Sequence, residues 1–343
     1  MVEGSEERGI ARGMSCGTSL FSLARGLAGI VSAALLFASQ ALLAQSWPAK
    51  PIRYIVPFPP GGSTDLISRH LAEKLPPRLG VPVVIENLGG AGGAIGLARV
   101  VQAPPDGYTI GLGNSATHTI LPHLLIKVPF DASADFTPIS LLAEYTNVLV
   151  VTSRLPARDL KEFLALAKSR PGVLTYASAG TGSSNRLTSE LLAKQAGVRF
   201  THVPYKGNAP ALADVAGGHI DWMFATVSEV RAFVQSGRVR ALGISGRTRD
   251  ALLPDVPPLA DTLRDFEVVG FMGLFGPAQL PAPIVERLNA EVRTILGAAD
   301  MLERLAALGM KARSSSPEEL AARVRTDSAL WKSVIAAAGI SPE

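Results

Sequence analysis

The sequence predicts an α/β protein of two domains, and three observations support this prediction. The chain has 343 residues, which is enough for about two domains of the usual size. From Lys50 onward, strand-like and helix-like patterns alternate, as in α/β proteins with mostly parallel sheets. Two extended segments, 136–142 and 147–152, separate one alternating block from the next. They are expected to carry the chain from one domain into the other.

The individual elements follow from apolar periodicity and from turn residues. Residues 52–58 form an apolar strand pattern, and a helix at 64–75 places Ile67, Leu71 and Leu75 on one face. The later elements are assigned in the same way. Further strands are expected at 81–86, 108–112, 174–177, 200–203, 220–224, 239–245 and 268–276, and further helices up to residue 102 and at 157–169, 184–196, 209–216, 283–296 and 317–338.

The order of the elements predicts a first domain that is discontinuous in sequence. We expect residues 46–147 and 248–343 to form this domain and residues 148–247 to form the second. No repeat of fixed period and no low-complexity linker interrupts the mature chain. The two domains are therefore expected to be joined only by extended segments.

The first 45 residues (1–45) have the pattern of a secretory signal peptide. Arginines precede an apolar run at 27–37, and small residues at candidate cleavage positions follow it. A transmembrane anchor is the rival interpretation. Polar residues interrupt the run, however, and it falls short of about 20 strongly apolar residues. The true start of the protein is either Met1 or Met14.

The composition excludes several classes of protein. The net charge of +4 is small and the basic residues are scattered, so no surface is evidently built to bind nucleic acid. The single cysteine, Cys16, precedes the apolar run, so the mature chain would contain no disulfide and no cysteine-ligated metal. The five histidines form no H-E-x-x-H or similar pair, and we expect neither a metal nor a cofactor. No long apolar run follows Ser46, so the mature protein should be soluble and exported.

A loop rich in proline and glycine follows the first predicted strand. Its prolines stiffen the chain, and Gly61 and Gly62 allow a close backbone approach. Ser63 or Thr64 is expected to cap the next helix, whose positive end would face outward as an anion site. For one such loop alone, an ordinary capped turn is the better interpretation. The candidate ligand-binding residues here are Pro60, Gly61, Gly62, Ser63, Thr64 and Asp65.

A second loop, after the strand predicted at 174–177, has the same layout. It contains more small and hydroxyl residues than a helix cap needs. Because both loops offer donors at a helix N-terminus, the sequence predicts that a ligand carboxylate binds between them. The candidate ligand-binding residues here are Ser178, Ala179, Gly180, Thr181, Gly182, Ser183 and Asn185.

Four further side chains are weaker candidates. Tyr205 offers an apolar ring with a polar tip, although packing within the protein is an equally good interpretation. Asn114 and Thr117 follow a predicted strand, at the edge where ligands bind in open α/β sheets. Thr226 follows another strand and is a candidate for ligand selectivity.

Enzyme motifs are weak or missing. Residues 111–116 match G-x-G-x-x-A after a strand, but no clear acidic strand end follows, and an exported protein has no ready supply of NAD. The chain contains neither a phosphate-binding P-loop nor a G-x-S-x-G motif. A triad of Ser178 or Ser183 with His202 and Asp214 is conceivable, but such a trio arises by chance in a chain of this length. We therefore expect a binding protein rather than an enzyme.

The order of several segments resembles the substrate-binding proteins of tripartite tricarboxylate transporters, often called Bug or TctC-like proteins. Together these segments are highly specific, and the resemblance extends over nearly all of the mature chain. The matching segments are VPFPPGGSTD at 56–65, VVIENLGGAGGAIG at 83–96, PDGYT at 105–109, DFTP at 135–138, YASAGTGSSNRL at 176–187, VPYKGNAP at 203–210 and LPDVP at 253–257.

The resemblance implies a type II-like periplasmic binding protein, an α/β fold with a hinge of crossing strands and a ligand cleft between its two domains. It implies that the loops at 59–65 and 178–185 bind the carboxylate of a small organic acid through backbone and hydroxyl groups, assisted by ordered water. It also implies a monomer in the periplasm that delivers its ligand to the membrane subunits of a transporter.

Two positions depart from the family pattern. Arg186 stands where the family often has histidine, and Phe271 lies where tryptophan or tyrosine is frequent. Arg186 would either add a cation for a second carboxylate or face solvent. The identity of the ligand stays open, and two other functions remain alternatives: a sensor that presents its ligand to a signalling receptor and, with less support, a secreted hydrolase.

Overall fold

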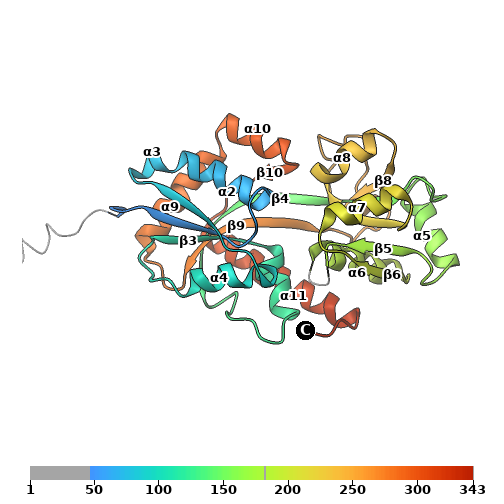
Figure 1. The fold of residues 1–343 in the computed structure, drawn as a ribbon, viewed down its shortest axis with the longest axis horizontal. Helices are drawn as coiled ribbons and strands as arrows, with labels where there is room; N and C mark the ends of the chain where they lie inside the picture. Colours follow the sequence, from blue (N-terminus) through green and yellow to red (C-terminus); the bar gives the residue numbers. More distant parts are fainter. Residues whose placement is uncertain (1–46, 181–182, 343) are drawn as a thin grey trace, which may run out of the picture. The chain divides into compact units, whose positions relative to one another are not determined.

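The computed structural model describes residues 47–180 and 183–342 (Figure 1). The predicted signal peptide lies outside the described residues, as do the candidate ligand-binding residues Thr181 and Gly182. The chain divides into two units, Met1–Ala49 and Lys50–Glu343. Every helix and strand that the structure describes lies in the second unit.

The second unit alternates strands and helices along most of its length, as the sequence predicts. The strands are β1 (Ile52–Val56), β2 (Val83–Asn87), β3 (Thr109–Asn114), β4 (Phe136–Thr152), β5 (Thr175–Ser178), β6 (Thr201–Pro204), β7 (Trp222–Thr226), β8 (Val239–Ile244), β9 (Val269–Pro277) and β10 (Met310–Ala312). The helices are α2 (Ser63–Lys74), α3 (Pro76–Leu79), α4 (Ala94–Val101), α5 (Leu160–Ser169), α6 (Ser184–Ala196), α7 (Asn208–Gly217), α8 (Val227–Gln235), α9 (Ala282–Leu296), α10 (Ala299–Ala307) and α11 (Pro317–Ala337), with short turns η1 (Ala91–Gly93), η2 (Ala116–Ile120), η3 (Leu121–His123) and η4 (Leu259–Asp261).

The strands pair in two groups that share β4. In the first group the order is β2-β1-β3-β9-β4, and β10 also pairs with β4. In the second group the order is β4-β7-β5-β6, and β8 also pairs with β4. Each group contains three parallel strands, with β1 between β2 and β3 in the first and β5 between β6 and β7 in the second. In both groups the carboxyl ends of these strands therefore lie at one edge.

A single long strand replaces the two predicted extended segments. β4 has 17 residues, pairs with β9 from Phe136 to Thr146, and pairs with β7 from Asn147 to Val151. The interruption predicted at 143–146 is wrong. These residues form the passage between the groups, where β10 and β9 flank β4 and complete its backbone hydrogen bonding.

The expectation of mostly parallel sheets is also wrong. Of the nine strand pairings among the described residues, four are parallel and five are antiparallel. The reason is the path of the chain, which leaves the first group along β4 and returns to it along β9 in the opposite direction (Figure 1). The domain boundaries at 147/148 and 247/248 stay a prediction, although β4 changes its pairing partner at the first of them.

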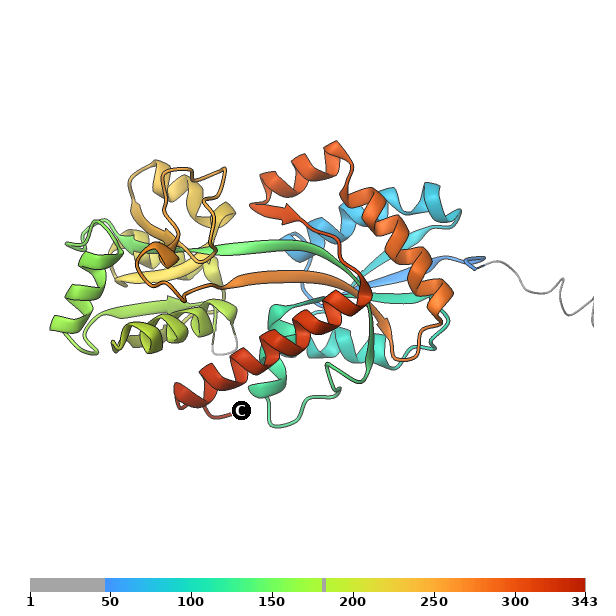
Figure 2. The ribbon, with the colours of Figure 1, turned by 180° about the vertical axis from the view of Figure 1, so that it is seen from behind.

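The C-terminal helix α11 contributes to the hydrophobic core of each group. Leu320 and Val324, near its N-terminal end, pack with residues of β1 and β9. Trp331, Val334 and Ile335, near its C-terminal end, pack with residues of β5, α6 and β7. Figure 2 shows α11 extending from the first group toward α6. This helix therefore braces the passage between the groups.

Three helices and a strand were not predicted. The helices are the one-turn α3, α8 and α10, and the short strand β10 pairs with β4. A capping box in which Glu229 bonds Thr226 starts α8, so the T-x-x-E signal for this helix was present in the sequence. None of the described helices combines the length and apolar character needed to cross a membrane.

Candidate functional site

The predicted site residues lie at the carboxyl ends of parallel strands in both groups. The first loop, which we define as residues 57–62, follows β1, and Asn114 ends β3. The second loop, which we define as residues 179–183, follows β5, and the structure describes it without residues 181 and 182. Tyr205 and Thr226 stand at the ends of β6 and β7. Figure 1 shows the strands of both groups directed toward the middle of the ribbon, where β4 and β9 run side by side from one group to the other.

A buried carboxylate fixes the first loop. Asp65 is only 2% exposed and accepts hydrogen bonds from the Gly61 N–H at 2.9 Å, the Arg69 Nε at 2.8 Å and the Asn87 Nδ2 at 2.9 Å. Asn87 Nδ2 also donates to the Phe58 carbonyl at 3.1 Å. Burial alone would raise the pKa of the Asp65 carboxyl, but these hydrogen bonds outweigh burial and lower it. Asp65 therefore positions the first loop, and its own oxygens are occupied.

The helix that follows the first loop has no side-chain cap. Gly62 is the N-cap residue of α2, and neither Ser63 nor Thr64 caps this helix, so that prediction is wrong. Within the described part of the chain, the N–H groups of Ser63 and Thr64 have no hydrogen-bond acceptor. Ser63 is exposed and Thr64 is buried, so of these two donors the Ser63 N–H belongs to an exposed residue at the positive end of α2.

An amide side chain fixes the second loop in a similar way. Asn185, in the first turn of α6, is 4% exposed. Its Oδ1 accepts from the Ala179 N–H at 3.3 Å, and its Nδ2 donates to Asn208 Oδ1 at 2.8 Å and to the Phe224 carbonyl at 3.1 Å. Asn185 therefore ties the second loop to α7 and β7, as Asp65 and Asn87 tie the first loop to β2.

The hydroxyl groups of Ser178, at the end of β5, and of Ser183, at the end of the second loop, bond within the protein. Ser178 is fully buried, and its Oγ contacts His202 Nε2 at 2.7 Å and accepts from the Gly180 N–H at 3.2 Å. Ser183 is the N-cap residue of α6, but its Oγ donates to the Gly180 carbonyl at 2.6 Å instead of capping the helix. Among the described residues, the Arg186 N–H donates to Asn185 Oδ1 at 3.0 Å, and the N–H groups of Ser184 and Asn185 have no acceptor.

The polar groups of Asn114 and Thr117 are largely bonded to each other. The Thr117 N–H donates to Asn114 Oδ1 at 3.0 Å, and Thr117 Oγ1 accepts from the Asn114 N–H at 3.0 Å. Thr117 is fully buried and Asn114 is 6% exposed. The pair therefore shapes the turn after β3. These contacts use the backbone N–H and the Oδ1 of Asn114 but not its Nδ2.

The hydroxyls of Tyr205 and Thr226 are held by carboxylates of the chain itself. Tyr205 donates to Asp214 at 2.5 Å, and burial followed by this hydrogen bond raises the pKa of Tyr205 to about 12. Thr226 Oγ1 donates to Glu229 at 2.8 Å within the capping box of α8. The Glu229 carboxylate thus lies at the N-terminus of α8, where an anion would otherwise bind, whereas no side chain caps α2 or α6.

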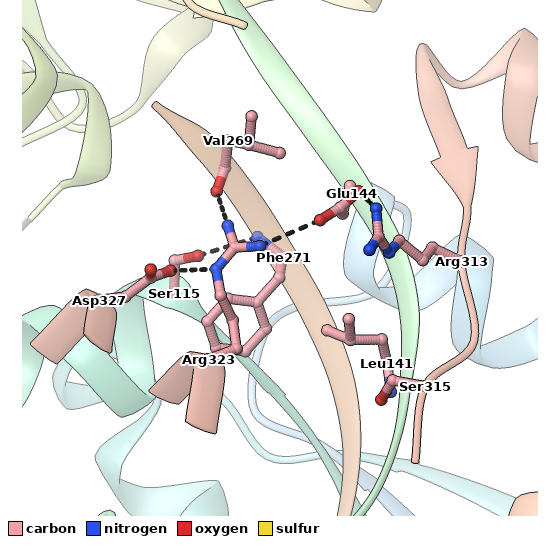
Figure 3. A network of polar contacts seen from close by, with 9 residues as sticks. All are labelled: Ser115, Leu141, Glu144, Val269, Phe271, Arg313, Ser315, Arg323 and Asp327. Atoms are coloured by element: carbon pink, nitrogen blue, oxygen red, sulfur yellow. Dashed lines mark hydrogen bonds and ion pairs between the residues drawn. The ribbon is translucent and has the colours of Figure 1, made fainter. Parts of the chain in front are cut away.

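Sequence reasoning missed the charged residues that hold the crossing segment, which we define as residues 144–146 and 269–271. Arg323 of α11 bonds Glu144 of β4 at 3.0 Å, Asp327 at 2.7 Å and the Val269 carbonyl of β9 (Figure 3). Glu144 also pairs with Arg313 at 3.2 Å. An ionic network therefore ties α11 to both strands where they pass between the groups. No local pattern signals it, because Glu144 and Arg323 are 179 residues apart.

A cavity of about 680 Å³ lies beside this segment, next to β10 and residues 246–252. Its lining includes Tyr145 together with Arg247, Arg249 and Lys311, and it contains none of the predicted site residues.

Comparisons with known proteins decide the family. The family described as tripartite tricarboxylate transporter family receptor (TctC) matches residues 67–340. The chain is 40% identical to a UPF0065 protein in the tcbD-tcbE intergenic region of Pseudomonas sp. strain P51, over 91% of this chain and 93% of that protein. The chain belongs to the tripartite tricarboxylate transporter receptor family.

Solved structures are also similar, among them that of the periplasmic binding protein BugD, with a TM-score of 0.73 and 32% identity, covering 87% of this chain and 100% of that one. Rpa4515 of R. palustris, solved with adipate, has a TM-score of 0.77 and 31% identity, covering 87% of this chain and 100% of that one. MatC of Rhodopseudomonas palustris, solved with bound malate, has a TM-score of 0.72 and 35% identity, covering 84% and 100%. The family resemblance and the α/β binding-protein fold predicted from the sequence are therefore confirmed.

The two positions that depart from the pattern of this receptor family do not lie in the loops. Arg186 interacts with Tyr176 and lies near His202, along α6. Phe271 is fully buried in the core of the first group, and the Arg323 guanidinium lies 5.7 Å from its ring. Neither arrangement points to direct contact with a ligand carboxylate.

Proposed function

We propose that this receptor is an exported protein that binds a small organic carboxylate between the first and second loops. The observation that carries the proposal is that α2 and α6, at the carboxyl edges of the two groups, both lack a side-chain cap, while Asp65 and Asn185 accept hydrogen bonds from Gly61 and Ala179 in the loops before them. N–H groups at the start of a helix that is already in place can bind an anion without a large ordering cost.

The strength of such a site is adequate for a transport receptor. Four charge-assisted hydrogen bonds contribute about 1.5 to 3 kcal/mol each, or roughly 6 to 12 kcal/mol before ordering costs. Micromolar binding requires about 8 kcal/mol. Contacts to the rest of the ligand must therefore supply the remainder and the selectivity.

The mechanism proposed is closure of the two groups about the crossing segment when a ligand joins the loops. The closed form would then be recognised by the membrane subunits of a tripartite transporter in the periplasm. Relatives solved with adipate and malate support a dicarboxylate as the class to test first.

We expect at least one acid in a panel of mono-, di- and tricarboxylates and aromatic acids to raise the melting temperature clearly. Ligand at about 100 times its dissociation constant stabilises the folded state by about 2.7 kcal/mol, because it binds only that state. Thermal-shift measurements over the panel provide the check. If none of the acids raised the melting temperature, the result would count against the proposal.

A hydrolase is the second candidate, because Ser178 does contact His202. The geometry favours binding over catalysis. Ser178 is fully buried, its Oγ is also bonded within the second loop, and Asp214 bonds Tyr205 instead of the histidine. Turnover of a bound ester, lost in Ser178→Ala, would support the hydrolase instead.

A further inference from the structure

Tyr145 lies in the crossing segment, between the two sets of strand ends. In the register of the strands, Tyr145 of β4 is opposite Gly270 of β9 and Met310 of β10. Two residues later, Asn147 pairs with Thr226 of β7. Tyr145 therefore belongs to the part of β4 that joins the first group to the second.

The ring of Tyr145 lies over Gly270. A Cβ added at Gly270 would come within 2.3 Å of Tyr145 Cζ and 2.7 Å of its hydroxyl oxygen. Side chains alternate along a strand, so Tyr145 points away from the face that carries Glu144. Glu144 is held on that other face by Arg313 and Arg323, which fixes the orientation of this part of β4 (Figure 3).

One serine at each of the two edges lies near the Tyr145 phenol. The side chains of Ser184, the first residue of α6, and of Ser115, which follows β3, both lower its pKa. Burial is the main cause that raises the pKa of Tyr145, and the nearby Glu229 carboxylate raises it further. The phenol therefore keeps its proton at neutral pH and can donate it. Because the serine hydroxyls can donate to the phenolic oxygen, its own O–H remains for another acceptor.

We propose that Tyr145 is a ligand-contacting residue, whose O–H donates to a carboxylate oxygen of the ligand from between the starts of α6 and η2. This inference rests on the proposed function and adds a side-chain donor to the backbone donors of the two loops. A phenol is a directional donor in a fixed position, so Tyr145 selects ligands that present an acceptor oxygen there.

Substitution of Tyr145 by Phe tests the contact, because it removes one oxygen and keeps the ring. We expect the affinity for malate or adipate, whichever the wild-type protein binds more tightly, to fall about tenfold or more in calorimetric titrations, the loss of one hydrogen bond to a charged group. The matched control is Tyr54→Phe, the same change in a fully buried ring of β1, which should leave the affinity unchanged.

A second variant tests the position of the ring without changing the phenol. Gly270→Ala places a methyl group where the Tyr145 ring lies, and it should weaken binding to a similar degree while Tyr145 remains present. Melting temperatures of the free variants show that each is folded. If the wild-type protein binds but Tyr145→Phe binds equally well, the role of Tyr145 is wrong and the proposed function stands. If the wild-type protein binds no acid of the panel, both are wrong.

Discussion

Gly62→Asn is expected to lower carboxylate affinity at least about 100-fold while the melting temperature stays the same or rises slightly. Gly62 is the N-cap residue of α2, with a φ of −79° that any residue adopts, and the space where a Cβ would stand is empty for 4 Å. Asparagine is a preferred N-cap and is a few tenths of a kcal/mol better than glycine there. Its side-chain oxygen would take the N–H donors that the ligand needs, and each such bond contributes about 1.5 to 3 kcal/mol.

Gly62→Val separates the effect on ligand affinity from the effect on protein stability. Valine supplies no acceptor, so it should abolish binding by covering the donors while costing up to about 1 kcal/mol as a poor N-cap. The measurement is calorimetric titration of both variants alongside thermal melts of the free proteins. A merely structural role for Gly62 would make affinity follow stability in the two variants. Affinity that survives both changes would mean that the first loop is only a turn.

Arg323→Met is expected to destabilise the protein by about 2 to 4 kcal/mol at neutral pH. The arginine is 25% exposed, and its partners Glu144 and Asp327 are 13% and 16% exposed, so the change leaves two largely buried carboxylates with fewer partners. Methionine keeps the length of the side chain, so lost packing contributes little. Urea unfolding of the free protein measures the effect.

The pH dependence of this loss follows from Asp327. Burial raises the pKa of the Asp327 carboxyl, and Arg323 offsets part of that rise. Without Arg323 the pKa rises further, so the charged carboxylate penalises the folded state above that pKa and the penalty disappears as the pH falls below it. The defect of Arg323→Met should therefore shrink toward pH 4, and Asp327→Asn should restore part of the stability at pH 7.

Arg313→Met is the matched control for the crossing segment. Arg313 pairs with the same Glu144 but is 57% exposed, and exposed pairs contribute less than about 1 kcal/mol. The role given to the network would be contradicted if both variants lost the same free energy of unfolding. It would also be contradicted if the loss in Arg323→Met did not change with pH.

Sequence patterns predicted the elements and the two loops because these depend on local signals. The proline and glycine residues before α2 and the small residues before α6 mark strand-to-helix junctions wherever they occur. The identity of the helix caps was less predictable. Ser63 and Thr64 are good caps by type, but the helix begins at Ser63, one residue earlier than predicted, so the N-cap position falls on Gly62.

The residues that fix the site depend on distant contacts, which a single sequence does not show. Asp65 looked like a ligand-binding residue, but its position is explained by Asn87, which is 22 residues away. The hydroxyls of Tyr205 and Thr226 looked available, but Asp214 and Glu229 accept their hydrogen bonds. Residues 143–146 were predicted to interrupt two extended segments, and only the pairing of β4 with β9 shows that Tyr145 belongs to one continuous strand.

The structure of the protein with malate or adipate bound tests the central claim most directly. The account predicts a carboxylate within hydrogen-bonding distance, about 3 Å, of backbone N–H groups at the starts of α2 and α6. A ligand seated instead in the cavity beside β10, against Arg247, Arg249 and Lys311, would contradict it.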